Sequence, residues 1–351
     1  MKKLILIIVF IVTGFCLNAQ SHHDKQKVNT FTNPVLPSGA DPWVIYHHGY
    51  YYYMQTMGNH LELWKTKDMA ALRDADKKTI WLPPASGPYS KQIWAPEIHF
   101  INGKWYVYFA ADDGRNESHR IYIIENSSPD PMSGDWIFKG EITDSSNKWA
   151  IDPSVFEYKE QWYMIWSGWQ DDVNGQQNIY IAKMKNPLTI EGERVEISYP
   201  KYRWEKHGDL KNDRIKHLSV NEGPEILKHN GEVFLVYSAS ACWTDYYALG
   251  MLKLVNESNL LNIHSWKKYH KPVFKQSPEN SVYATGHNGF FKSPDGKQDW
   301  IIYHANEKPG EGCGNKRSPR MQPFTWNKNG TPDFGIPVKT TERLKVPSGT
   351  W

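Results

Sequence analysis

The chain has few cysteines and almost no apolar pattern of helical period. Three of its 351 residues are cysteines, Cys16, Cys242 and Cys313, and no CxxC or Cys/His pattern with metal-binding spacing is present. The absence of such a pattern argues against a zinc-type centre. Apolar residues that recur every three to four positions are almost absent, so the sequence predicts strands rather than helices. No low-complexity linker divides the chain, which favours a single folded domain.

The chain also lacks a basic stripe. Lysine and arginine total 41 against 38 acidic residues, and the net charge is +3, of which Lys2 and Lys3 supply two. Binding to the phosphate backbone of a nucleic acid requires clustered positive charge. We therefore expect no nucleic acid partner.

A long apolar run occurs at the N-terminus, from Leu4 to Leu17, and it is too short to span a bilayer comfortably. Lys2 and Lys3 precede it, and Asn18-Ala19-Gln20 follow it. This order is typical of a secretory signal peptide. We expect residues 1–19 to be cleaved as a signal and residues 20–32 to form a flexible lead-in. The mature protein is then secreted or periplasmic, with no membrane insertion after cleavage.

Aromatic residues are abundant, at 14% of the chain with 16 tryptophans, and many of them belong to a fivefold repeat. Each repeat has an opening, a turn eight residues after the start of the opening, and then a strand rich in aromatic or β-branched residues. The openings are Asp41-Pro42-Trp43, Ala95-Pro96-Glu97, Asp152-Pro153-Ser154, Gly223-Pro224-Glu225 and Asn288-Gly289-Phe290. A repeat of 50–70 residues made of strands is typical of a radial array.

The repeat predicts an all-β fold, a five-bladed β-propeller that forms a single domain over residues 33–351. A third strand is visible in every repeat, and the blades are expected at 33–90, 91–145, 146–205, 206–275 and 276–345. Asn33–Leu36 is expected to join the last blade and close the ring, which removes exposed strand edges. A β-sandwich with long loops is the alternative, but the regular order of strand, turn, strand and strand in each repeat disfavours it.

Three acids stand at the starts of first strands: Asp41, Asp152 and Glu222. The first strand of a propeller blade lies nearest the axis, so these side chains are expected to meet at one mouth of the central channel. Two carboxyl groups across a cleft are the minimum needed to hydrolyse a glycosidic bond. An acid beside proline can also be a turn residue, but three equivalent positions favour a shared site. Glu222 precedes its repeat position by one residue, so the repeat does not settle its direction.

Five motifs together resemble glycoside hydrolase family 43, and within it the exo-acting α-L-arabinofuranosidases. They extend over most of residues 33–340 in a specific order and spacing. The motifs are Ser38–Trp43 (SGADPW), Tyr89–His99 (YSKQIWAPEIH), Lys148–Ser154 (KWAIDPS), Val220–Glu225 (VNEGPE) and Thr285–Gly289 (TGHNG). The resemblance implies a five-bladed propeller with an inverting mechanism. It makes Asp41 the general base, Glu222 the general acid, and Asp152 the group that orients the acid and tunes its pKa. Inversion implies that the Asp41 and Glu222 carboxyl groups lie about 6.5–9.5 Å apart.

The resemblance also implies a set of substrate-binding residues. Trp94 resembles the tryptophan that lines the family's pocket, with Trp43 and Trp169 as further stacking candidates. Either Arg317 or Arg320 resembles an arginine that contacts the sugar or the acid, and the other is expected on the solvated surface. Paired-carboxylate hydrolysis requires no cofactor.

His287 resembles a family histidine that reaches the central channel and helps hold a metal, commonly calcium, through water. The alternative is a buried histidine bonded to backbone.

The expected function is an inverting glycoside hydrolase that releases terminal α-L-arabinofuranose from arabinan, arabinoxylan or arabinogalactan-type polysaccharides. A β-D-xylosidase of the same family is the nearest alternative, and a non-catalytic carbohydrate-binding propeller is an alternative of another class. Cys242 and Cys313 lie after the second strands of neighbouring repeats. Export permits a disulfide between them, but two separate buried thiols are the favoured expectation.

Overall fold

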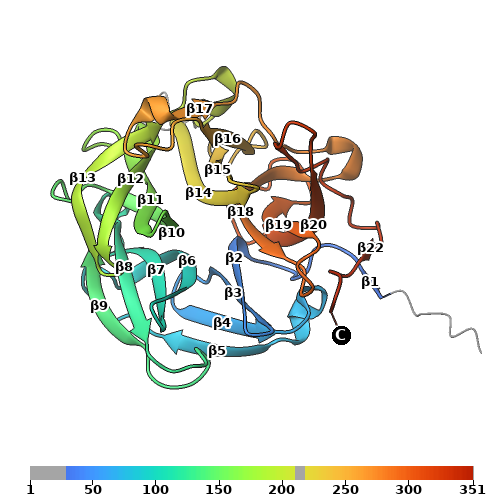
Figure 1. Ribbon diagram of the computed structural model, residues 1–351, viewed down its shortest axis with the longest axis horizontal. Helices are drawn as coiled ribbons and strands as arrows, with labels where there is room; N and C mark the ends of the chain where they lie inside the picture. The colour runs from blue at the N-terminus through green and yellow to red at the C-terminus, as the bar shows by residue number, and fades with distance from the viewer. Residues whose placement is uncertain (1–28, 210–217, 351) are drawn as a thin grey trace, which may run out of the picture.

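A computed structural model describes residues 29–209 and 218–350. Within these ranges, five four-stranded antiparallel blades stand around a central axis, with the first strand of each blade innermost (Figure 1). The fold is thus the expected five-bladed β-propeller. Its blades consist of β2 (Ala40–His47), β3 (Tyr50–Thr56), β4 (Leu61–Thr66) and β5 (Asp76–Trp81); β6 (Lys91–Ile101), β7 (Lys104–Asp112), β8 (Arg120–Asn126) and β9 (Ile137–Ile142); β10 (Ala150–Tyr158), β11 (Gln161–Trp169), β12 (Gln176–Asn186) and β13 (Thr189–Ser198); β14 (Ser219–His229), β15 (Glu232–Ala239), β16 (Ala248–Leu254) and β17 (Trp266–Lys268); and β18 (Tyr283–Lys292), β19 (Asp299–Asn306), β20 (Ser318–Trp326) and β21 (Pro332–Asp333).

Helical structure in the described residues is confined to short 3-10 turns in the connections. They are η1 (Met69–Asp74), η2 (Asn116–Ser118), η3 (Arg203–Glu205), η4 (Ile263–Ser265) and η5 (Pro278–Asn280). No helix in the described ranges has the length and apolar character needed to cross a membrane.

Two-residue turns connect the first and second strands of blades one to four. Asn102-Gly103 and Asn230-Gly231 both have positive φ at the two turn residues, as the sequence predicts for hairpin turns of this type. Such turns fix the register, and therefore decide which side chains face the neighbouring blades.

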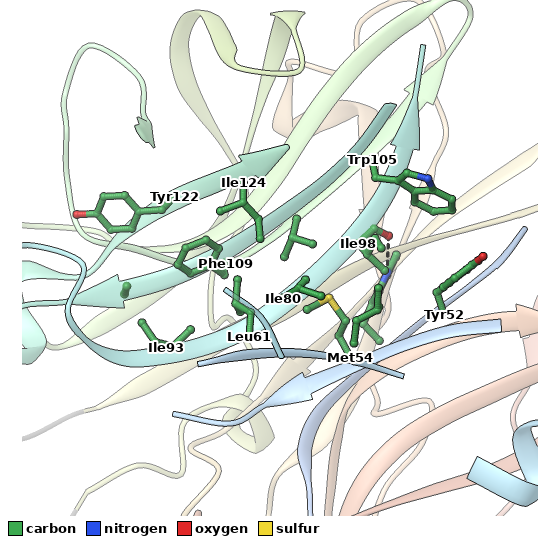
Figure 2. Packing of buried hydrophobic residues seen from close by; sticks show 14 residues of the cluster. Tyr52, Met54, Leu61, Ile80, Ile93, Ile98, Trp105, Phe109, Tyr122 and Ile124 are labelled. Carbon is green, nitrogen blue, oxygen red and sulfur yellow. Dashed lines mark hydrogen bonds between the residues drawn. The ribbon is translucent and has the colours of Figure 1, made fainter. Parts of the chain in front are cut away.

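Apolar cores fill the spaces between neighbouring blades. Between blades one and two, fourteen buried residues pack together, including Met54 and Leu61 from one side and Ile98 and Phe109 from the other (Figure 2). The strands are apolar on both faces because each blade packs against a neighbour on either side. In β7, for example, every residue after Lys104 is buried.

The innermost strands share a local distortion that positions the cavity residues. A residue with positive φ stands near the start of each: Asp41, Ala95, Asp152, Gly223 and His287. In each blade the pairing with the second strand shifts register at this residue, which identifies a bulge.

These bulges correct the predicted opening of blade five by one residue. Gly289 pairs with Ile302 as Trp43 pairs with Met54, so His287, rather than Asn288, is the equivalent of Asp41. In blade four the equivalent residue is Gly223. A Cβ there would lie 3.2 Å from the His287 ring, so glycine suits both the positive φ and the space.

The ring closes through the N-terminal segment, as expected. The Val35 N–H donates to the Pro319 carbonyl at 2.9 Å, and the Asn33 side chain bonds both the N–H and the carbonyl of Met321. Thr30–Phe31 forms β1, which pairs with β22 (Leu344–Lys345). This pairing corrects the predicted flexible lead-in over its last residues, because 30 and 31 belong to a strand. The predicted signal peptide and the rest of the lead-in, up to residue 28, lie outside the described residues.

Candidate active site

A cavity of about 320 Å³ lies at one mouth of the central channel. Asp41, Asp152 and Glu222 line it together, although they come from blades one, three and four. His287 of blade five completes the inner wall. The bulges bring these side chains together, because each one turns the start of an innermost strand toward the axis.

The Asp41 carboxyl group is held by partners from blades one and five. The Thr56 hydroxyl donates to Oδ2 at 2.5 Å, and the same hydroxyl accepts the Ala95 N–H at 2.7 Å. His287 Nδ1 lies 3.2 Å from Oδ1, and Arg317 Nη1 lies 3.4 Å from it. Burial works to raise the pKa of Asp41, but His287, Arg317 and His304 together outweigh it and hold this pKa well below its usual range. Asp41 is therefore ionised at neutral pH.

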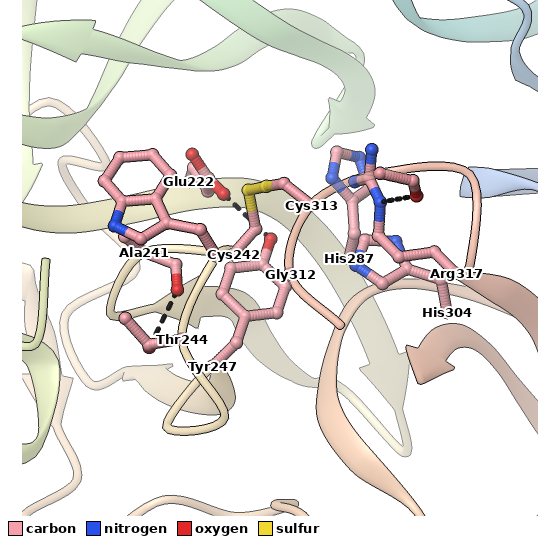
Figure 3. Close-up of a disulfide and its surroundings, with 12 residues drawn as sticks. Glu222, Ala241, Cys242, Thr244, Tyr247, His287, His304, Gly312, Cys313 and Arg317 are labelled. Atoms are coloured by element: carbon pink, nitrogen blue, oxygen red, sulfur yellow. Dashed lines mark hydrogen bonds between the residues drawn. A yellow bond between two sulfur atoms is a disulfide. The ribbon is translucent and has the colours of Figure 1, made fainter. Parts of the chain in front are cut away.

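Glu222, by contrast, is mostly protonated below about pH 7. Burial raises its pKa to about 7, the ionised Asp41 adds to this shift, and a hydrogen bond from Tyr247 opposes it. The Tyr247 hydroxyl donates to Oε1 at 2.9 Å (Figure 3). Because Gly223 occupies the bulge position and has no side chain, the preceding residue, Glu222, supplies the carboxyl group of this blade.

Asp152 contacts the backbone beside Glu222. Its Oδ2 accepts the Gly223 N–H at 2.9 Å, which fixes the chain directly after the acid. Burial raises the pKa of Asp152 to about 7, against the opposing effect of His287. The charge of Asp41 adds to the raised pKa of Glu222, and the charge of Glu222 adds to the raised pKa of Asp152.

Aromatic side chains form the cavity wall at blades two and three. Trp94 lines the cavity, as expected, and stacks on His119 at 4.2 Å between ring centroids. Trp149 also lines it, and its Nε1 donates to the Asn116 carbonyl at 2.6 Å. Trp149 was not predicted as a cavity residue, although it stands only three residues before Asp152 in the motif Lys148–Ser154.

The other two tryptophan candidates do not reach the cavity. Trp43 is 8% exposed, belongs to the core between blades one and two, and donates its Nε1–H to the Ile98 carbonyl. Trp169 is 1% exposed and stacks behind Trp149 at 4.6 Å, with the planes 10° apart. In a regular strand Trp43, two residues after Asp41, would face the same side as Asp41. The bulge at Asp41 reverses this alternation, so Trp43 points into the core instead. The prediction that these two rings contact substrate is therefore wrong; Trp169 supports a ring that lines the cavity.

The two arginine candidates separate clearly. Arg317 precedes β20, lines the cavity and approaches Asp41. Arg320 lies three residues further, within β20, and it is 1% exposed. The expectation of a solvated surface arginine is wrong for Arg320, because the β20 side chains at this level pack inside the ring.

His287 faces Asp41, and its donors fit direct metal binding poorly. Nδ1 points to the carboxylate, and calcium prefers oxygen ligands. Across residues 29–209 and 218–350, no three His, Cys, Asp or Glu side chains gather as a metal site. A calcium ion held through water at His287 stays a prediction, and no chemical step is derived from it.

The two cysteines form a disulfide, which corrects the expectation of separate thiols. Cys242 and Cys313 have Cα atoms 5.3 Å apart, and their bond joins the loop after β15 to the loop after β19 (Figure 3). The sequence places each cysteine after the second strand of its blade, but only the packing of neighbouring blades brings the two loops into contact. Both cysteines line the cavity.

Sequence reasoning missed further residues that line the cavity or contact its acids. Thr56 stands opposite Ala40 across the first hairpin, so the strand pairing of blade one signals its position. Tyr247 and Trp243 lie in the loop after β15, where no repeat pattern applies. Residues 112–119 and 171–177 contribute Asn116, Asn174 and Gln177 to the cavity lining.

Comparison with known proteins agrees with this arrangement. The family profile "Glycosyl hydrolases family 43" matches residues 31–332. An extracellular exo-α-(1→5)-L-arabinofuranosidase of Streptomyces avermitilis is 41% identical over 318 residues, which cover 88% of this chain and 64% of that protein. The protein of the same description from Streptomyces chartreusis is 34% identical over 290 residues, or 81% and 85% of the two chains.

A solved structure of similar shape is the α-L-arabinofuranosidase from Lactobacillus brevis. It has a TM-score of 0.81 and 36% identity, and the match covers 89% of this chain and 98% of that one. The chain thus spans slightly less than two thirds of the Streptomyces avermitilis relative and nearly the whole of this structure. The profile match, the shared propeller and the level of identity lead to one conclusion: this chain belongs to glycosyl hydrolases family 43.

Proposed function

We propose that the protein is an inverting exo-α-L-arabinofuranosidase that releases terminal arabinofuranose from arabinan and related arabinose-containing plant polysaccharides. One observation carries the proposal: a single cavity holds an ionised carboxylate, Asp41, and a carboxyl group with a pKa of about 7, Glu222. Two carboxyl groups with pKa values pushed apart are the equipment of a base and an acid.

In the proposed mechanism, Asp41 removes a proton from the attacking water and Glu222 protonates the departing glycosidic oxygen. Thr56 fixes the Asp41 carboxylate, and Arg317 keeps it ionised. Asp152 acts as a positioning residue, because its bond to the Gly223 N–H holds the backbone that carries Glu222. The separation of about 6.5–9.5 Å needed to seat a water remains a prediction.

The names of the relatives support the choice of sugar and linkage. Two of them are named extracellular exo-α-(1→5)-L-arabinofuranosidases. We infer the same preference, with an arabinose-containing oligo- or polysaccharide as substrate, and a secreted or periplasmic location. Trp94 and Trp149 fit this inference, since sugar C–H faces stack on aromatic rings.

Replacing Glu222 by glutamine tests the assignment. Glutamine keeps the shape but cannot transfer a proton, so turnover of arabino-oligosaccharides should fall by roughly 10²–10⁴-fold. The loss should be smaller for 4-nitrophenyl α-L-arabinofuranoside, because this leaving group needs little protonation. Released arabinose would be quantified by chromatography, and the fold would be checked by circular dichroism.

Glu193→Gln, at an exposed position of β13, is the matched control and should keep full turnover. Unchanged oligosaccharide turnover in Glu222→Gln would contradict the assigned acid. Wild-type protein should also be assayed on 4-nitrophenyl β-D-xylopyranoside. Faster hydrolysis of this xyloside than of the arabinoside would make the protein a xylosidase instead, and glycan binding without any released sugar would make it a binding module.

A further inference from the structure

The rim of the cavity beside Glu222 is built by the two loops that the disulfide joins. Cys242 and Trp243 come from the loop after β15, Cys313 comes from the loop after β19, and all three line the cavity together with Glu222. The same β15 loop carries Tyr247, which donates to Glu222 (Figure 3). The loop after β15 therefore both contacts the Glu222 carboxyl group, through Tyr247, and forms this part of the rim, through Trp243.

Trp243 is fixed in place before any sugar arrives. Its Nε1–H donates to the Gly208 carbonyl at 3.0 Å, and the residue before it is covalently tied to blade five. The Thr244 N–H and hydroxyl both donate to the Ala241 carbonyl at 2.9 Å, which tightens the turn around it. A ring held in this way loses little conformational entropy when a ligand stacks on it.

The direction of proton transfer defines what lies against this rim. Glu222 protonates the oxygen that leaves, so the leaving sugar must lie on the Glu222 side of the cavity, and the attacking water on the Asp41 side. The rim on the Glu222 side offers an indole and a disulfide. Both are apolar and polarisable, and they suit the C–H face of a furanose ring.

We propose that Trp243, held by the Cys242–Cys313 disulfide, is the platform that binds the leaving sugar of an arabino-oligosaccharide. The proposal rests on the proposed function and deepens it. It assigns the residues through which the enzyme would prefer a substrate whose leaving group is a sugar over one whose leaving group is a small alcohol. Neither cysteine takes part in the chemical step.

Trp243→Ala tests the platform with two substrates that differ in the leaving group. For α-1,5-arabinobiose, kcat/KM should fall roughly three- to tenfold, which is the range expected for a lost aromatic contact. For methyl α-L-arabinofuranoside, kcat/KM should change less than about twofold, because methanol does not reach the ring. Tyr246→Ala is the matched control: this residue of the same loop is 59% exposed and lines a different hollow. It should leave both substrates unaffected.

The disulfide is tested by the double variant Cys242→Ser/Cys313→Ser. Loss of the bond should raise KM for arabinobiose more than for the methyl glycoside. Dithiothreitol should produce the same change in the wild type and none in the double variant. An equal loss on both substrates would mean that the bond only supports the fold, and this half of the proposal would fail.

Two outcomes separate this proposal from the proposed function. If the wild type releases arabinose from both substrates and Trp243→Ala lowers both equally, the function stands and the platform is refuted. Calorimetric titration of arabinobiose into Glu222→Gln, with and without Trp243→Ala, gives a readout that needs no turnover. Weaker binding in the Trp243 variant supports the platform even if hydrolysis is not observed, and equal binding refutes it.

Discussion

Residue by residue, the three carboxyl groups of the cavity share one chemistry but differ in their partners. Asp41 faces Arg317 and His287 and receives the Thr56 hydroxyl, so its charged form is favoured. Glu222 receives a hydrogen bond from the neutral Tyr247 hydroxyl, and burial dominates. The difference in pKa follows from these contacts, because positive charges and donors stabilise a carboxylate while burial destabilises it.

Tyr247→Phe should move the alkaline limb of the pH profile. The hydroxyl of Tyr247 lowers the pKa of Glu222, so its removal should raise that pKa above about 7. A general acid must be protonated, and kcat/KM of the wild type should therefore fall as the pH rises through about 7. In the variant this fall should occur at higher pH, with a lower maximum because Glu222 loses its positioning contact.

The measurement is kcat/KM on arabinobiose from pH 4 to pH 9. Tyr246→Phe, an exposed neighbour, serves as the control and should reproduce the wild-type curve. The apparent pKa belongs jointly to Glu222 and Asp152, since both titrate near pH 7. An alkaline limb that stays in place in Tyr247→Phe would refute the role given to the hydroxyl.

Among the elements, the innermost strands combine two tasks. Beyond the bulge they pair regularly and bury apolar side chains between the blades, and at the bulge they turn polar side chains to the axis. Ile98 illustrates the first task. It is fully buried in β6 and packs in the core between blades one and two (Figure 2).

Ile98→Ala should lower the free energy of unfolding by about 2–5 kcal/mol, because it removes buried methyl groups and leaves a cavity in the core. Ile137→Ala is the control in the same blade: this side chain is 55% exposed, and its loss should change stability by less than about 0.5 kcal/mol. Urea denaturation followed by tryptophan fluorescence measures both. Equal stability of the two variants would show that this interblade core contributes little.

For the whole molecule, ring closure places carboxyl groups from opposite blades inside the channel. Glu97 of blade two and Glu225 of blade four are both buried, and Ser154 of blade three donates its hydroxyl to Glu225 at 3.3 Å. Burial, followed by the charge of Glu225, raises the pKa of Glu97 well above its usual value. They stand 128 residues apart in the sequence, each at the third position of its blade opening.

This burial makes stability depend on pH. A carboxyl group whose pKa is higher in the folded chain binds more protons there than in the unfolded chain, so the free energy of unfolding falls as the pH rises. This contribution to stability is fully present below about pH 4.5, the pKa of an ordinary glutamate. Between that pH and the raised pKa of the folded state, the free energy of unfolding falls by about 1.4 kcal/mol per pH unit for one such group.

Glu97→Gln should flatten this dependence, because glutamine stays neutral. Relative to the wild type, the variant should gain stability between pH 5 and pH 9, as measured by denaturant unfolding at several pH values. Glu117→Gln, at an exposed position, is the control and should follow the wild type. Parallel curves for Glu97→Gln and the wild type would mean that Glu97 titrates normally.

The sequence by itself determined the strands, the turns, the fivefold repeat and the positions of Asp41, Asp152 and Glu222 at strand starts. These features are local: side chains alternate along a strand, and Asn-Gly pairs adopt positive φ wherever a hairpin needs them. A repeat whose copies are strands then predicts a ring.

Only the tertiary structure decided which tryptophans face the cavity, which arginine approaches Asp41, that the cysteines pair, and that Asp152 holds the Gly223 backbone. Each of these depends on contacts between different blades. A bulge of one residue reverses which side chains face the axis, and no local pattern reports it in advance. The cavity therefore follows from closing the ring, where segments far apart in the sequence meet.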